Sequence, residues 1–101
     1  MARKNRDTNI EFLFETILAL QNKEECELFF EDLCTVAELQ EMSRRLLAAR
    51  MLAANTVYTE IAEQTGLSTA TISRVNRCLK YGDGGYRLAL DKTKKADGDG
   101  K

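Results

Sequence analysis

The stretch from Thr56 to Val75 constrains the fold of this chain most, because it fits two short helices joined by a tight turn. Apolar residues in its first half recur at helical spacing, at Val57, Ile61 and Ala62. Gly66 then ends the first helix at a position where a left-handed backbone conformation carries little steric cost. The small side chain of Ala62 leaves room for two helices to cross at a steep angle. The pattern therefore predicts two crossed helices with Gly66 in the turn between them.

A polar cap and an apolar stripe predict the second helix of this pair. Leu67 is expected to point into the core, and Ser68 can accept a hydrogen bond at the helix N-terminus. Ile72 and Val75 continue the apolar face at helical spacing. The combination is the helix-turn-helix pattern, in which the second helix enters the major groove of DNA. The plain alternative is a helical hairpin that serves only an all-α core.

The outward positions of this second helix carry hydroxyl, methyl and basic groups. From Gly66 to Gly82 the chain has no aspartate or glutamate, although acidic residues outnumber basic ones by 16 to 15 overall. Such a surface suits a polyanion, and a solvated face that lacks acids by chance is the alternative. The side chains predicted to face base edges are Thr69, Ala70, Thr71 and Ser73. Those predicted to hold phosphates are Ser68, Arg74, Arg77 and Lys80.

Length and composition predict one small all-helical domain. The chain has 101 residues and no proline, and no run shows the two-residue alternation of a strand, so we expect an all-α fold. We expect a single domain over residues 1–96, including a loose basic arm at residues 1–7, and a disordered tail at residues 97–101. Such arms can contact phosphate or a minor groove, but more often they are only disordered chain ends.

Residue counts disfavour several classes of function. Three cysteines without regular spacing and no histidine predict neither a metal site nor a disulfide framework. Free thiols, no apolar signal core and no apolar run of membrane length predict a cytoplasmic protein without a membrane partner. No nucleophile stands beside a base and no phosphate loop is present, so we do not expect an enzyme.

Capping signals place the other helices and give about six short helices in all. Thr8 with Glu11 and Thr35 with Glu38 have capping-box spacing, and Asn22 with Glu25 resembles a cap. The first predicted helix begins at Thr8. The next two run from Asn22 through Leu33 and from Thr35 to about Ala54. The helix-turn-helix then extends to about Leu79, and a last helix runs from Tyr86 to about Lys94. In the last of these, the residues expected to be buried are Tyr86, Leu88, Ala89 and Leu90.

The long predicted helix after Thr35 is apolar on nearly every side in its second half, from Leu46 to Ala54. A helix that is apolar all round must be covered all round. The two helices before it also have apolar faces broader than one neighbour covers. In so small a chain a second copy is the favoured cover, so we predict a homodimer. The alternative is a central helix wrapped by its own neighbours.

Three segments carry a family resemblance: residues 39–47 (LQEMSRRLL), residues 59–66 (TEIAEQTG) and residues 68–80 (STATISRVNRCLK). They resemble the Trp repressor superfamily, and within it the YerC/YecD group of Trp repressor-like proteins. The resemblance covers roughly Leu33 to Leu90, and its third segment is the most specific. It implies an intertwined all-helical dimer whose two recognition helices bind a double-stranded DNA operator one helical turn apart.

The same resemblance implies a ligand pocket that this chain has altered. In the Trp repressor two arginines flank the indole ring of L-tryptophan, and Arg44 and Arg74 match them. The glycine that makes room for the ring is Val75 here, and the serine that helps to hold the ligand amine is Cys78. A β-branched side chain should clash in a flat slot, and a buried ammonium would lack a partner. We therefore expect no cofactor and disfavour L-tryptophan as a corepressor.

The leading hypothesis is a sequence-specific DNA-binding transcriptional regulator, with repression as its expected action. Ligand-free and ligand-gated versions both stay open, and the effector is unknown. The alternative is a helical protein-interaction module that keeps the helix-turn-helix as scaffold, which the near-neutral net charge of −1 favours. Without a corepressor, the two arginines serve as phosphate contacts or in ion pairs with Glu41 or Glu38.

Overall fold

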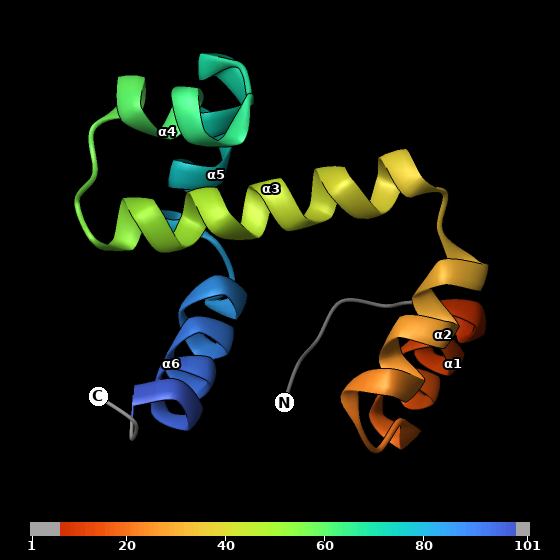
Figure 1. The fold of residues 1–101 in the computed structure, drawn as a ribbon. Helices are drawn as coiled ribbons and strands as arrows, with labels where there is room; N and C mark the ends of the chain where they lie inside the picture. The colour runs from red at the N-terminus through yellow and green to blue at the C-terminus, as the bar shows by residue number, and fades with distance from the viewer. Residues whose placement is uncertain (1–6, 99–101) are drawn as a thin grey trace. The chain divides into compact units, whose positions relative to one another are not determined.

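The computed structural model describes residues 7–98, which form six α-helices and no strand (Figure 1). The helices are α1 (Thr8–Ala19), α2 (Lys23–Leu33), α3 (Val36–Ala53), α4 (Tyr58–Thr65), α5 (Thr69–Tyr81) and α6 (Gly85–Gly98). The predicted all-α fold with about six helices is therefore confirmed. Within the same residues, no helix has both the length and the apolar character needed to span a membrane.

The chain divides into two compact units, Met1–Leu39 and Gln40–Lys101. The first contains α1, α2 and the start of α3, and the second contains the rest of α3 together with α4, α5 and α6. The single domain predicted over residues 1–96 stays a prediction.

Local hydrogen bonds fix the helix starts of the first unit. α1 begins at Thr8, but its cap is Asp7, whose side chain accepts a hydrogen bond from the Ile10 backbone N–H at 2.9 Å. The prediction that Thr8 is the cap is therefore wrong by one residue, because Asp7 is itself a strong capping residue. Asp7 also belongs to the cap rather than to the predicted loose arm, whose other residues, 1–6, lie outside the described part of the chain.

The next two caps are the predicted ones. The side chain of Asn22 accepts from the Glu25 N–H at 2.9 Å. Thr35 and Glu38 form a reciprocal capping box, in which each side chain accepts a hydrogen bond from the backbone N–H of the other, at 3.0 and 2.9 Å. These short motifs therefore determine where α2 and α3 begin.

The first unit contains little buried apolar surface of its own. Neither α1 nor α2 includes a buried residue. Phe29 and Phe30 meet edge to face at 5.3 Å between ring centroids, and both rings are half-buried. Exposed large apolar side chains on the two helices include Phe12, Leu18, Leu28 and Leu33.

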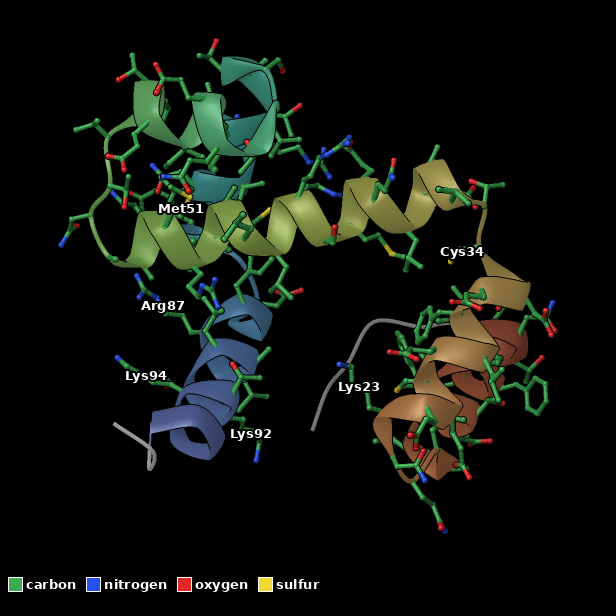
Figure 2. The ribbon with its side chains drawn as sticks, viewed as in Figure 1. Lys23, Cys34, Met51, Arg87, Lys92 and Lys94 are labelled. Atoms are coloured by element: carbon green, nitrogen blue, oxygen red, sulfur yellow. The ribbon has the colours of Figure 1, made fainter. Side chains whose placement is uncertain are left out.

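The second unit has a continuous apolar core. Two helix positions with small side chains, Ala48 and Ala49 of α3, are completely buried there. The side chains of α4, α5 and the turn between them that join this cluster are Ile61, Leu67, Ile72 and Val75. In Figure 1, α4 and the start of α5 lie on one side of the C-terminal half of α3, and α6 lies on the other. Met51 of α3, labelled in Figure 2, packs against the cluster, as do Tyr86 and Leu90 of α6.

Some predicted core positions are exposed. Val57 is 63% exposed because it precedes α4 as its N-terminal flanking residue and is not within the amphipathic face. Leu88 and Ala89 are exposed on α6, whereas Tyr86 and Leu90 are half-buried as expected. α6 continues to Gly98, past the predicted end near Lys94 and into the first two residues of the predicted disordered tail. Residues 99–101 of that tail lie outside the described residues.

Candidate nucleic-acid interface

The turn between α4 and α5 is fixed by its backbone and by one buried hydroxyl. Gly66 has φ 75°, the left-handed conformation predicted for it, and its N–H donates to the Ala62 carbonyl at 2.8 Å. The buried Thr65 hydroxyl donates to the Ile61 carbonyl at 2.8 Å and accepts from the Leu67 N–H at 3.1 Å. Thr65 therefore ties the end of α4 to Leu67 in the turn. Sequence reasoning overlooked this residue, and its polarity inside an apolar pattern was the available signal.

Ser68 caps α5 as predicted. Its hydroxyl oxygen accepts from the Thr71 backbone N–H at 3.1 Å and donates to the Thr71 hydroxyl, also at 3.1 Å. The Ser68 hydroxyl hydrogen is thereby used inside the protein. The Thr71 hydroxyl accepts that bond, so its own hydrogen stays available to donate to another group. The first turn of α5 consequently presents an ordered set of hydroxyl groups.

The two faces of α5 differ sharply in burial. Ile72, Val75 and Leu79 are buried and attach the helix to the core. Of the predicted DNA-facing residues only Thr71 is half-buried; the exposed ones are Ser68, Thr69, Ala70, Ser73, Arg74, Arg77 and Lys80. The fold thus places these side chains at the surface of one helix and its cap. The first turn of α5 has no acidic residue, and Lys80 lies in its last turn.

The predicted ligand-pocket residues are only partly brought together. Arg74 and Cys78 line an open hollow together with Arg77, Tyr81 and Gly82. Arg44 lies exposed on α3 and does not line this hollow. Val75 is only 2% exposed and belongs to the apolar core cluster. A Val75 side chain in that position fills space between α5 and its neighbours.

Other candidate chemistry is sparse. Glu38, one of the acidic partners considered for the arginines, accepts a hydrogen bond from the Thr35 backbone instead. The cysteines Cys26, Cys34 and Cys78 are free thiols, and only Cys78 is exposed. In the part of the chain that the structure describes, no three His, Cys, Asp or Glu side chains gather in a group that could hold a metal ion.

The fold and its exposed helix define an all-helical protein with a helix-turn-helix. The sequence model of the Trp repressor protein family matches residues 8–94, and the chain belongs to that family. It is similar to the uncharacterized protein YerC of Bacillus subtilis strain 168, with 49% identity over 94 residues, which cover 93% of this chain and 90% of YerC.

Two solved structures have the same fold. A TrpR-like protein from Eubacterium eligens is 45% identical, covers 87% of this chain and 91% of its own, and aligns with a TM-score of 0.84. A proposed Trp repressor from Staphylococcus aureus is 46% identical, covers 87% of this chain and 88% of its own, and aligns with a TM-score of 0.83. The predicted family resemblance is therefore confirmed.

Proposed function

We propose that this chain is a sequence-specific DNA-binding transcriptional regulator that inserts α5 into the major groove. The observation that carries the proposal is the division of α5 into two faces. One face is buried through Ile72, Val75 and Leu79, and the other is exposed and free of acidic side chains. A helix held rigidly by its apolar side and presenting hydroxyl, methyl and guanidinium groups suits the edges and backbone of duplex DNA.

In this proposal the two ends of the exposed face have different roles. The small side chains at the start of α5 contact base edges, through Thr69, Ala70, Thr71 and Ser73. Ser68 lies at the helix N-terminus, where the backbone N–H groups and the helix dipole favour a phosphate. Arg74, Arg77 and Lys80 neutralise phosphates further along the helix.

We further propose that the regulator works as a homodimer. The exposed apolar side chains of α1 and α2 support this, with Leu18 at 84% exposure and Phe12 and Leu28 each at 68%. On α3, Leu46 is also exposed beside an open groove whose lining includes Leu47 and Leu90. Apolar surface of this extent is typical of an interface between chains.

Repression is the expected action, and DNA binding without L-tryptophan is its expected mode. The buried position of Val75 supports the second point, because its side chain occupies core space next to the exposed Arg74 and Cys78. The packing that orients α5 is therefore supplied by the protein's own apolar groups.

The proposal is tested by selecting bound sites from randomised duplex DNA at physiological salt, with and without L-tryptophan. We expect enrichment of a palindrome whose half-sites are about one helical turn apart, independent of tryptophan. Tryptophan dependence would overturn the argument from Val75. Affinities confined to the non-specific range, roughly 10⁻⁴ to 10⁻⁶ M, would favour the alternative of an interaction module with a scaffold helix-turn-helix.

Arg77→Ala tests the assigned interface at one position. Removal of a phosphate contact should weaken binding to all sequences alike and lower the magnitude of the salt slope by about one. The slope is measured as the logarithm of the association constant against the logarithm of salt concentration. Lys92→Ala is the matched control, because Lys92 is exposed and projects from α6 in Figure 2. An unchanged slope for Arg77→Ala would exclude Arg77 from the interface.

A further inference from the structure

Tyr81 is the most exposed of the large apolar side chains in the described part of the second unit, with 82% of its surface open. An aromatic ring usually contributes packing, and its hydroxyl usually has a hydrogen-bond partner when the ring is covered. A ring with this much of its surface exposed contributes little packing to this chain. Tyr81 also follows directly on the residues assigned to DNA, in the last turn of α5.

The helical register places Tyr81 on the same face as the proposed DNA contacts. Ala70, Arg74, Arg77 and Tyr81 are separated by four, three and four residues, which puts them on one stripe of an α-helix. The buried residues of α5 occupy the opposite side. Tyr81 therefore extends the exposed stripe by one further turn beyond Arg77.

Tyr81 and the two arginines share one hollow in the surface. Its lining consists of Arg74, Arg77, Cys78, Tyr81 and Gly82. A Cβ atom added at Gly82 would collide with the carbonyl oxygen of Cys78, so this wall carries no side chain unless the backbone shifts. Asp83, the next acidic residue, lines a neighbouring hollow with Tyr86 and not this one. Two guanidinium groups and a phenol, with no carboxylate among them, form a set of donors suited to a phosphate group.

We infer that Arg74, Arg77 and Tyr81 bind a phosphate group in this hollow, and that in the DNA complex it belongs to the backbone beside the major groove. The DNA part of the inference rests on the proposed function. Tyrosine hydroxyls are among the groups that contact DNA phosphates. Ala70 and Tyr81 are eleven positions apart, which is about 16 Å along the helix at 1.5 Å per residue and exceeds the groove width of about 12 Å. If Ala70 lies at base edges, Tyr81 therefore reaches the phosphates that border the groove.

The first test measures binding of Tyr81→Phe to the selected duplex across a series of salt concentrations. Loss of the phenol donor should weaken binding about tenfold, since a hydrogen bond to a charged group is among the stronger ones. The salt slope should stay unchanged, because no charge is removed, in contrast to the lower slope expected for Arg77→Ala. Tyr86→Phe is the matched control, because it removes the same atom from a half-buried ring on α6.

Sedimentation of Tyr81→Phe decides whether the phenol hydroxyl contributes to self-association instead. An unchanged monomer–dimer equilibrium is expected, and a weakened equilibrium would overturn the inference by assigning the hydroxyl to the interface between two copies. Unchanged DNA affinity in Tyr81→Phe, with the wild type binding normally, would overturn the assignment to the DNA backbone while leaving the proposed function intact.

A second measurement separates a DNA phosphate from a free one. Inorganic phosphate is titrated into the wild type and Tyr81→Phe, and the NMR signals of the arginine Nε–H groups are followed. If the wild type binds no duplex, the proposed function fails, and this titration alone decides the inference. If phosphate shifts the Arg74 and Arg77 signals of the wild type, and shifts them less in Tyr81→Phe, the result supports a site for a free phosphate group in this hollow. No perturbation, together with unchanged DNA binding, would overturn the inference completely.

Discussion

The helix pair α1–α2 and the helix pair α4–α5 are similar in size but opposite in burial. The first pair has helices of 12 and 11 residues, and the second has helices of 8 and 13. No residue of α1 or α2 is buried, whereas Ile61 of α4 and Ile72 of α5 are completely buried. Side-chain caps begin α1 and α2 as well as α5, so helix formation and core formation are separate properties. The α4–α5 pair packs on apolar side chains of its own unit, whereas large apolar side chains of α1 and α2 are exposed.

The largest effect expected from this contrast is at Ile72. Ile72→Ala should lower the free energy of unfolding by about 3 kcal/mol, because it removes buried methyl groups and leaves a cavity at the centre of the core. Urea unfolding followed by circular dichroism measures the change. Ile72→Val should cost about 1 kcal/mol, and Ser73→Ala, at an exposed position of the same helix, should cost less than about 0.5 kcal/mol. An equal cost for Ile72→Ala and Ser73→Ala would contradict the burial of α5.

A smaller effect, on self-association, is expected at Leu18. Leu18→Ala should weaken dimer formation by about 2 kcal/mol if the open side chain is covered in the proposed homodimer. Sedimentation equilibrium over a range of protein concentrations measures the dissociation constant. Val57→Ala is the matched control, since Val57 is an exposed apolar residue beside α4. A wild type that stays monomeric at all concentrations would overturn the proposed homodimer, and a Leu18→Ala variant that associates normally would remove Leu18 from its interface.

Local motifs were the part of this fold that could be predicted from the sequence. Gly66 adopts the left-handed conformation, Ser68 caps α5, and Thr35 forms its capping box. Each depends on contacts within about four residues, so the sequence contains all the information needed. The exposed face of α5 followed from the same logic, because helical periodicity around Ile72 and Val75 determines which side chains point away.

Burial beyond one helix was harder to predict. Val57 fits the apolar period of α4 yet flanks the helix, and Leu88 is 60% exposed on α6. Periodicity identifies an apolar stripe but not the element that covers it. The ligand-pocket set stays a prediction, with Val75 in the core cluster and Arg44 exposed on α3. The hollow around Tyr81 involves a residue outside the predicted set, although its spacing from Arg74 and Arg77 was visible in the sequence.

The smallest of these effects is expected at the capping box that begins α3. Thr35→Ala should lower the free energy of unfolding by about 1 kcal/mol, because the Glu38 N–H loses its acceptor. Glu38→Gln should cost only a few tenths of that amount, since an amide oxygen can still accept from the Thr35 N–H.

Hydrogen exchange then relates this cap to the contrast between the helix pairs. If the core of the second unit is stable by itself, Thr35→Ala should speed amide exchange in the first turn of α3 and leave the Ile61 and Ile72 amides protected. Equal loss of protection at the first turn of α3 and at Ile72 would mean that both units open in one cooperative step. In that case the helices without buried residues would contribute as much to stability as the helices with them, and the contrast in burial would not translate into a contrast in stability.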